Sequence, residues 1–167
     1  REAFATVGIT VRSLHQQDDA LAAVNAASLI VVGGGNTFRL LQVLRQQGLL
    51  APMAARVRSG AARYIGWSAG SNLATPTIRT TNDMPVVDPG GFDALDLVPF
   101  QINPHYYNLE IEGFRGETRD QRLTEFTTLS PTTPVLGLPE GDWIPVSGDT
   151  CSLHGAHAAR WFLGELT

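Results

Sequence analysis

The sequence predicts an α/β fold, a three-layer αβα sandwich with a mostly parallel central sheet and an antiparallel C-terminal meander. The continuous apolar run Leu29–Val32 is typical of a strand that helices cover on both faces. Helical spacing follows it up to Gly48, so strand and helix alternate as in α/β domains. Several short apolar runs separated by turns come after residue 134, which is typical of antiparallel strands.

Each element follows from a local pattern. Pro52 at a first-turn position and Gly60 at the end delimit one helix, and prolines with paired glycines between residues 76 and 104 exclude long helices there. The pattern predicts helices at 18–27, 38–48, 51–59, 69–74 and 118–129, and strands at 7–11, 29–32, 63–67, 135–138, 143–146, 151–154 and 158–162.

Composition limits the classes of function. The net charge of -4 and the scattered arginines offer no basic face for nucleic acid. The single Cys151 excludes an internal disulfide framework and a multi-thiolate zinc site, which favours a reducing, cytoplasmic setting. No apolar stretch approaches the roughly 20 residues that cross a bilayer. We expect one α/β domain over residues 1–167, with an N-terminal strand lying outside this chain.

The pentapeptide Gly66-Trp-Ser68-Ala69-Gly70 has the spacing of a nucleophile elbow. It stands between a predicted buried strand and a predicted helix, where flanking glycines permit a tight turn that presents the serine hydroxyl. The turn also directs the Ala69 amide at a developing oxyanion. The alternative is an ordinary strand-to-helix turn in which Ser68 only caps the helix.

A second glycine-rich turn, Gly33-Gly-Gly35, ends another strand at the sheet edge where open α/β folds bind ligands. It lacks the spacing of a dinucleotide site and the lysine of a P-loop, so an oxyanion or substrate loop is favoured. The adjacent Asn36 and Thr37 are candidate substrate-binding residues. The alternative is a simple turn in which one of them caps the next helix.

A serine nucleophile needs a general base, and His105 is the best candidate among the four histidines because it follows an apolar segment in a predicted loop. A carboxylate should orient its imidazole. Glu140, at the end of an apolar strand, suits that role. Four aspartates remain rivals, with turn formation as their alternative role: Asp83, Asp88, Asp93 and Asp96.

Taken together, a series of ordered strings resembles the peptidase E family, the bacterial α-aspartyl dipeptidases. The strings begin at Gly33, Gly48, Ile65, Thr80, Gly91, Gln101, Gly116 and Gly137, and read GGGNTF, GLLAPM, IGWSAG, TTNDMP, GFDALDL, QINPH, GETR and GLPEG. The resemblance implies a fold related to class I glutamine amidotransferases and a triad of Ser68, His105 and Glu140. It also implies that residues 1–167 form a hydrolytic domain, with a short C-terminal tail lying outside this chain. It further implies an oxyanion hole formed by the amides of Gly35 and Ala69.

The same resemblance implies that Arg119 pairs with the aspartyl carboxylate of the substrate. Arginine suits that task because its planar fork can hold a carboxylate through two hydrogen bonds. Asp83 also matches a motif position of the family, where structural support of the site is its simplest role.

We therefore expect a serine peptidase that hydrolyses the peptide bond after an N-terminal aspartate through an acyl-enzyme. Small aspartyl peptides would be its partners, with no metal or other cofactor, and the protein would act as a monomer or homodimer. One alternative is a cyanophycinase-like hydrolase of β-linked aspartyl peptides. Another is a non-catalytic ligand-binding module of the same fold.

Overall fold

The computed structural model describes residues 2–107, 113 and 115–165. Strands and helices alternate through its first half, and short strands dominate the end of the chain. The elements are α1 (Glu2–Ala5), a 3-10 turn η1 (Leu14–Gln16), α2 (Ala20–Ala26), β1 (Leu29–Val32), α3 (Thr37–Gln46), α4 (Leu50–Arg58), β2 (Arg63–Gly66), α5 (Ala69–Ala74), β3 (Gln101–Tyr106), α6 (Arg119–Leu129), β4 (Val135–Pro139), β5 (Val146–Ser147), β6 (Thr150–Cys151) and β7 (Arg160–Phe162).

The strands pair in both directions, so the α/β class is confirmed. β1 runs parallel to β2, and β3 runs parallel to β4. β7 adds to β4 in the antiparallel direction, and β5 with β6 forms a separate antiparallel hairpin. Within the described residues, no strand pairing joins β2 to β3, so the central sheet expected from the sequence is divided into two parts.

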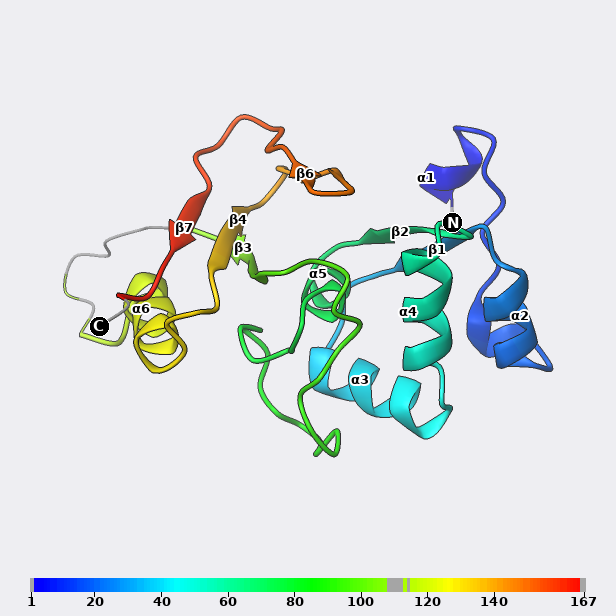
Figure 1. The fold of residues 1–167 in the computed structure, drawn as a ribbon, viewed down its shortest axis with the longest axis horizontal. Coiled ribbons are helices and arrows are strands. Elements are labelled where there is room, and N and C mark those ends of the chain that lie inside the picture. Colours follow the sequence, from blue (N-terminus) through cyan, green and yellow to red (C-terminus); the bar gives the residue numbers. More distant parts are fainter. Residues whose placement is uncertain (1, 108–112, 114, 166–167) are drawn as a thin grey trace.

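α5 connects these two parts. Figure 1 shows α2, α3 and α4 gathered around β1 and β2, while α6 lies beside β3, β4 and β7. α5 contacts β1, β2 and β3. Its Asn72 side chain donates a hydrogen bond of 2.8 Å to the carbonyl of Ile102 on β3. The segment that begins at Ser68 therefore sits between both groups of strands.

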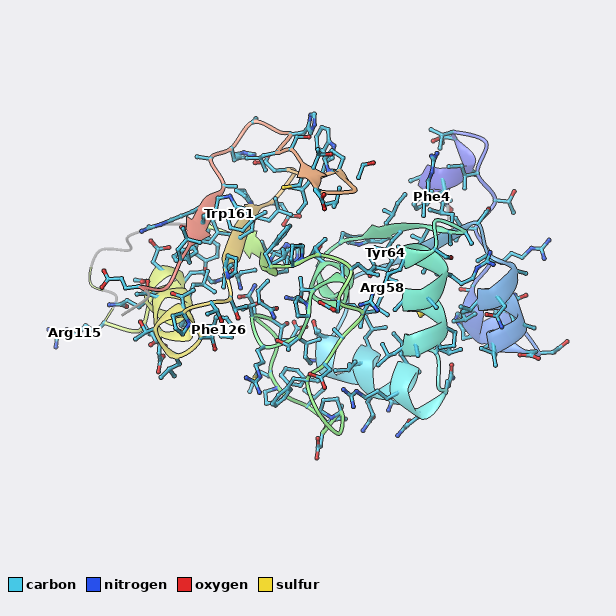
Figure 2. The ribbon with its side chains drawn as sticks, in the orientation of Figure 1. Phe4, Arg58, Tyr64, Arg115, Phe126 and Trp161 are labelled. Carbon is cyan, nitrogen blue, oxygen red and sulfur yellow. The ribbon has the colours of Figure 1, made fainter. Side chains whose placement is uncertain are left out.

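Apolar side chains form one core for each part. The core around β1 and β2 contains Leu41, Leu49 and Leu73, all fully buried. Two smaller clusters fill the other part, and they include Ile102 and Leu123. Figure 2 shows the same division, with Tyr64 and Arg58 near α4 and with Phe126 and Trp161 near α6 and β7. None of the helices in the described part of the chain has the length and apolar character that a membrane crossing requires.

The expected strand at 7–11 is wrong. Helix α1 ends at Ala5, Gly8 takes a φ of +76°, and the Ile9 amide returns to the Phe4 carbonyl at 2.9 Å. Val7 is 69% exposed. An apolar alternation becomes a strand only where a neighbouring strand completes its hydrogen bonds, and this segment has none within the described residues.

Two further expectations need correction. His105 lies inside β3 rather than in a loop after it, because β3 continues through Pro104 to Tyr106. The expected strands at 143–146 and 151–154 are shorter than predicted. They form a single bridge between Trp143 and His154, which encloses the short hairpin of β5 and β6. Most side chains there are exposed, so little apolar burial extends the pairing.

Candidate active site

Ser68 occupies the sharp turn between β2 and α5, with a φ of +55°. A side chain on Gly70 would place its Cβ 2.1 Å from the Val32 carbonyl oxygen, and one on Gly66 would lie 2.5 Å from the Gly70 carbonyl oxygen. Both contacts are to backbone, so neither can relax by a rotamer change. The glycines that the elbow motif requires are therefore needed here for close packing of the turn against β1.

The Ser68 side chain does not cap the helix. Ser68 stands at the N-cap position of α5, but its hydroxyl makes no capping hydrogen bond. Its backbone carbonyl accepts from the amides of Ser71 and Asn72, at 2.9 and 3.2 Å. The capping alternative thus accounts for the position of the residue but leaves its hydroxyl uncommitted. Residues with left-handed φ other than glycine are strained and concentrate at functional sites.

Tyr64 stabilises the elbow through a hydrogen bond to Gly70. Its hydroxyl donates a 2.7 Å hydrogen bond to the carbonyl of Gly70, and its ring lies 2.7 Å from where a Gly66 Cβ would be. Burial raises the pKa of this phenol well above its usual value, so Tyr64 stays neutral and keeps its proton for that bond.

The glycine loop after β1 lies directly against Ser68. A Cβ on Gly34 would be 3.1 Å from the Ser68 Cβ and 3.3 Å from its Oγ. Gly35 follows with a φ of +137°, a conformation that L side chains rarely adopt. Absence of side chains therefore lets this backbone approach the serine hydroxyl, as an oxyanion loop must.

His105 is the residue at an irregularity of the parallel ladder between β3 and β4. Pro104 pairs with Leu138 and Tyr106 with Pro139, so the register shifts at His105, whose φ is +54°. A bulge of this kind redirects a side chain. The imidazole Nδ1 contacts the Glu140 carboxylate just beyond the end of β4. Both side chains are exposed, at 48% for His105 and 80% for Glu140.

The rival aspartates make other contacts. Asp88 accepts from the Gly90 amide at 2.8 Å within a turn, and Asp96 pairs with Arg58 at 3.1 Å. Among the described residues, Ser68, Asp96 and His105 are the non-glycine residues with left-handed φ. Two of these three are the nucleophile and base expected from the sequence.

Arg119 is the first residue of α6. A capping box at Thr118 and Gln121 fixes this helix start. The guanidinium Nη1 donates to Asn103 Oδ1 at 3.1 Å and to the His105 carbonyl at 3.3 Å. The guanidinium carbon Cζ lies 4.8 Å from the centre of the Tyr107 ring. Arg119 thus lies beside the base, although 14 positions separate them.

Asn36 and Thr37 both have partners within the protein. Asn36 is the N-cap of α3, accepts from the Arg39 amide at 3.1 Å and donates to the Met84 carbonyl at 2.9 Å. The Thr37 side chain is fully buried, and its hydroxyl and amide donate to Asp83 at 2.5 and 2.7 Å. Asp83 therefore ties the loop after α5 to the start of α3.

Comparison with known proteins identifies a family for this chain. The family model for peptidase family S51 matches residues 1–154. The chain belongs to peptidase family S51.

Relatives in this family cover most of the chain. Peptidase E of Salmonella heidelberg strain SL476 is 60% identical over 161 residues, which are 96% of this chain and 70% of the relative. Peptidase E of Salmonella typhimurium strain LT2 is 59% identical over the same shares. A crystal structure from Listeria monocytogenes EGD-e, described as a candidate peptidase E, superposes with a TM-score of 0.71 at 25% identity, covering 93% of this chain and 75% of that chain. The serine peptidase expected from the sequence is confirmed by this membership.

The S51 chain brings the expected site residues together in two groups. Gly34, the residue before Gly35, lies against Ser68, and Arg119 and Glu140 lie with His105. Within the described residues, no hydrogen bond joins the Ser68 hydroxyl to the imidazole. In catalytic sites without substrate such bonds are often long and shorten only in the reacting complex.

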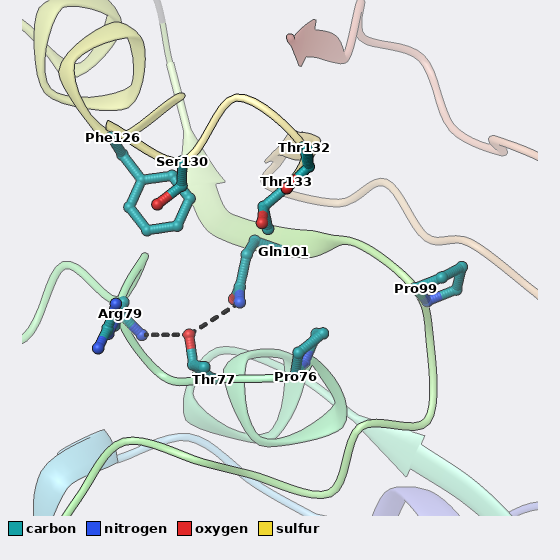
Figure 3. A pocket seen from close by; sticks show the side chains of 9 residues that line it. All are labelled: Pro76, Thr77, Arg79, Pro99, Gln101, Phe126, Ser130, Thr132 and Thr133. Atoms are coloured by element: carbon teal, nitrogen blue, oxygen red, sulfur yellow. Dashed lines mark hydrogen bonds between the residues drawn. The ribbon is translucent and has the colours of Figure 1, made fainter. Parts of the chain in front are cut away.

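Two cavities lie near the second group. One of about 150 Å³ is bordered by Arg119 and Asn103, together with Arg79, Thr80, Thr81, Asn82, Arg122, Leu123 and Phe126. The other, of about 190 Å³, is drawn in Figure 3 and is bordered by Pro76, Thr77, Arg79, Pro99, Gln101, Phe126, Ser130, Thr132 and Thr133. Neither cavity is bordered by Ser68, His105 or Glu140, but the smaller one is bordered by Arg119, the expected substrate-binding residue.

Sequence reasoning missed the buried amide of Asn103 and its neighbour Asn82, which is exposed. Asn103 is 2% exposed and contacts Arg119, and Asn82 donates to the Pro104 carbonyl at 2.8 Å. The available signal was Asn103 between the apolar residues Ile102 and Pro104, because a buried amide must find hydrogen-bond partners. No group of histidine, cysteine and acidic side chains suited to a metal ion occurs in the described part of the chain.

Proposed function

We propose that this S51 peptidase is a serine dipeptidase that hydrolyses the bond following an N-terminal aspartate. The observation that carries the proposal is Ser68, held in a left-handed elbow conformation with its hydroxyl free of capping and directly against a glycine loop. The Salmonella relatives named peptidase E support the same activity.

In this mechanism the Ser68 hydroxyl attacks the carbonyl carbon of the aspartyl residue while His105 takes its proton. The amides of Gly35 and Ala69 stabilise the oxyanion of the tetrahedral intermediate. Collapse breaks the C–N bond, and the imidazolium gives its proton to the leaving amine. Water, deprotonated by the same imidazole, then hydrolyses the acyl ester and releases aspartate. Glu140 holds the imidazole in the tautomer that can accept the serine proton.

Arg119 supplies the preference for aspartate. Its protein partners, Asn103 Oδ1 and the His105 carbonyl, are neutral, so its positive charge is oriented without being neutralised. Within the described residues its guanidinium has no carboxylate partner, whereas Arg122 pairs with Glu117 at 3.4 Å. The cavity beside Arg119 can admit a short acidic side chain.

The finer features of the fold and setting are part of this proposal. We infer a three-layer arrangement related to class I glutamine amidotransferases, in which residues 1–167 act as one domain because α5 packs on both groups of strands. The reduced state expected of the single Cys151 favours the cytoplasm. Small aspartyl peptides are the expected partners of a monomer or homodimer.

The test replaces Ser68 by alanine and compares it with Ser71→Ala. Ser71 lies on the same helix, and its hydroxyl makes only a long 3.4 Å contact to the Gly66 carbonyl. Ser68→Ala should abolish Asp-Leu hydrolysis and labelling by a fluorophosphonate, whereas Ser71→Ala should retain both. Full turnover by Ser68→Ala would overturn the nucleophile assignment. Failure of the unmodified protein to bind the fluorophosphonate would instead favour a non-catalytic ligand-binding module.

A pair of substrates distinguishes the proposed dipeptidase from a cyanophycinase-like hydrolase. Asp-Leu carries an α-linked bond, and β-aspartyl-arginine carries the β-linked bond that a cyanophycinase-like hydrolase would cleave. The proposal predicts turnover of Asp-Leu. Turnover of the β-linked peptide alone would contradict it.

A further inference from the structure

Asn103 is the buried centre of a polar cluster that contacts the proposed specificity residue. It is the third residue of β3, two positions before His105, and only 2% of it is exposed. Its side-chain amide nitrogen donates to the Thr80 carbonyl at 2.8 Å and to Asn82 Oδ1 at 2.7 Å. Its oxygen accepts from Arg119 Nη1 at 3.1 Å.

These three contacts fix which way the amide faces. Both N–H groups meet oxygen acceptors, and the oxygen meets a cation, so rotation of the amide by half a turn would bring its NH₂ against the guanidinium and its oxygen against two acceptors. A buried amide with unsatisfied groups is strongly disfavoured. The oxygen therefore has one stable direction, toward Arg119.

The same cluster reaches the backbone of the base. Asn82, which accepts from Asn103, donates to the Pro104 carbonyl at 2.8 Å, and Arg119 itself donates to the His105 carbonyl at 3.3 Å. The peptide groups on both sides of the strained His105 thus have hydrogen-bond partners in this cluster.

We propose that Asn103 is a positioning residue that aims the Arg119 guanidinium at the acidic side chain of the substrate. An arginine side chain has many rotamers, and holding it before binding removes an entropic penalty that the substrate would otherwise meet. Because the acceptor is a neutral amide, Asn103 fixes the direction of the guanidinium without competing for its charge. This role rests on the proposed aspartyl dipeptidase function.

The test measures kcat and KM for Asp-Leu and Ala-Leu in Asn103→Ala and Asn103→Asp. Asn103→Ala should reduce the preference for Asp-Leu, mainly through KM, by about tenfold to a hundredfold, which is the typical effect of losing one hydrogen bond to a charged group. Asn103→Asp keeps the shape but adds a carboxylate that pairs with Arg119, so it should reduce the same preference by raising KM for Asp-Leu.

Gln101→Ala provides the matched control. Gln101 lies on the same strand and is 1% exposed, but its partners are Thr75, Thr77 and Thr80 rather than Arg119. This variant should lose stability while keeping the wild-type preference. If Asn103 only stabilised the core, its variants would behave like the control. They would lower kcat/KM for Asp-Leu and for Ala-Leu by the same factor.

The outcomes separate the two proposals. Loss of preference in Arg119→Ala together with its retention in folded Asn103 variants would overturn the positioning role alone. Retention of preference in Arg119→Ala, or no preference in the wild type, would overturn the specificity assignment and the positioning role with it. Should both Asn103 variants fail to fold, Asn103→Ser decides the question by the same ratio, because it keeps a hydroxyl donor in the cluster but is too short to contact both Thr80 and Arg119.

Discussion

Replacing Glu140 by glutamine should separate the stability of the protein from its activity. The Glu140 side chain is 80% exposed and its partner His105 is 48% exposed. Ion pairs in such positions contribute about 0–1 kcal/mol to the free energy of unfolding, because water screens the charges. In a chain of this length that loss lowers the Tm by at most about 4 °C. Glu140→Gln should therefore fold almost as well as the wild type.

The effect on turnover should be far larger. A carboxylate at Nδ1 accepts a hydrogen bond from the Nδ1–H group, which keeps the ring proton on Nδ1 and leaves Nε2 free to receive the serine proton. A glutamine amide can instead donate to Nδ1, which places the proton on Nε2 and blocks that transfer. Loss of general-base catalysis of this kind lowers kcat by about 10²–10⁴-fold.

The assay follows Asp-Leu hydrolysis and thermal unfolding on the same preparations. Glu125→Gln is the control, because Glu125 is an exposed residue of α6 and its substitution removes the same charge. It should leave turnover and Tm at wild-type values. A folded Glu140→Gln that kept the wild-type kcat would refute the reasoning, because the exposed pair would then have neither a structural nor a catalytic role.

Three other predictions concern stability. Gly70→Ala should lower the free energy of unfolding by at least about 1–3 kcal/mol because its Cβ would lie 2.1 Å from the Val32 carbonyl oxygen. Gly48→Ala meets open space, so it should be destabilised only by the backbone strain of an alanine at a φ of +65°. Urea titration of both variants measures the difference. Burial opposes ionisation of Asp142, but hydrogen bonds from the 156–157 segment outweigh it and lower its pKa, so the carboxylate stabilises the fold above its unfolded-state pKa. That contribution should be lost as pH falls through the folded pKa, and Asp142→Asn should flatten the acid limb of a stability profile. Burial raises the pKa of Tyr64 above 10.0, so stability should fall as pH rises beyond that value, and Tyr64→Phe should weaken this alkaline loss while costing about 1 kcal/mol at neutral pH. An unchanged alkaline limb in Tyr64→Phe would contradict the assignment.

Local patterns predicted the elbow well because its requirements are local. Gly66 and Gly70 flank Ser68 within five residues, and the neighbouring strand and helix follow from adjacent apolar runs. The structure adds the reason for each glycine, since both meet backbone atoms of other segments or of the turn itself. Hydrophobic periodicity could not foresee the failure of the strand at 7–11, because pairing depends on a partner distant in the sequence.

The partner of His105 could be ranked from the sequence but not chosen from composition alone. Glu140 and the four aspartates all occur near turns, and only the register of β3 against β4 brings one carboxylate to the imidazole. Register between strands more than thirty positions apart is a tertiary property. The same holds for Asn103, whose contacts with Thr80 and Arg119 come from segments on either side of it in the chain.

The division of the strands around α5 bears on how this enzyme could change its substrate. The proposed nucleophile and its glycine loop belong to the segment between β1 and α5. The proposed base, its carboxylate and Arg119 belong to β3, the end of β4 and α6. Substitutions around Arg119 can therefore accumulate without touching the packing that holds Ser68. Directed evolution toward other N-terminal residues should find its productive mutations in the later segment, and recombination between family members should tolerate a crossover in the long loop between α5 and β3.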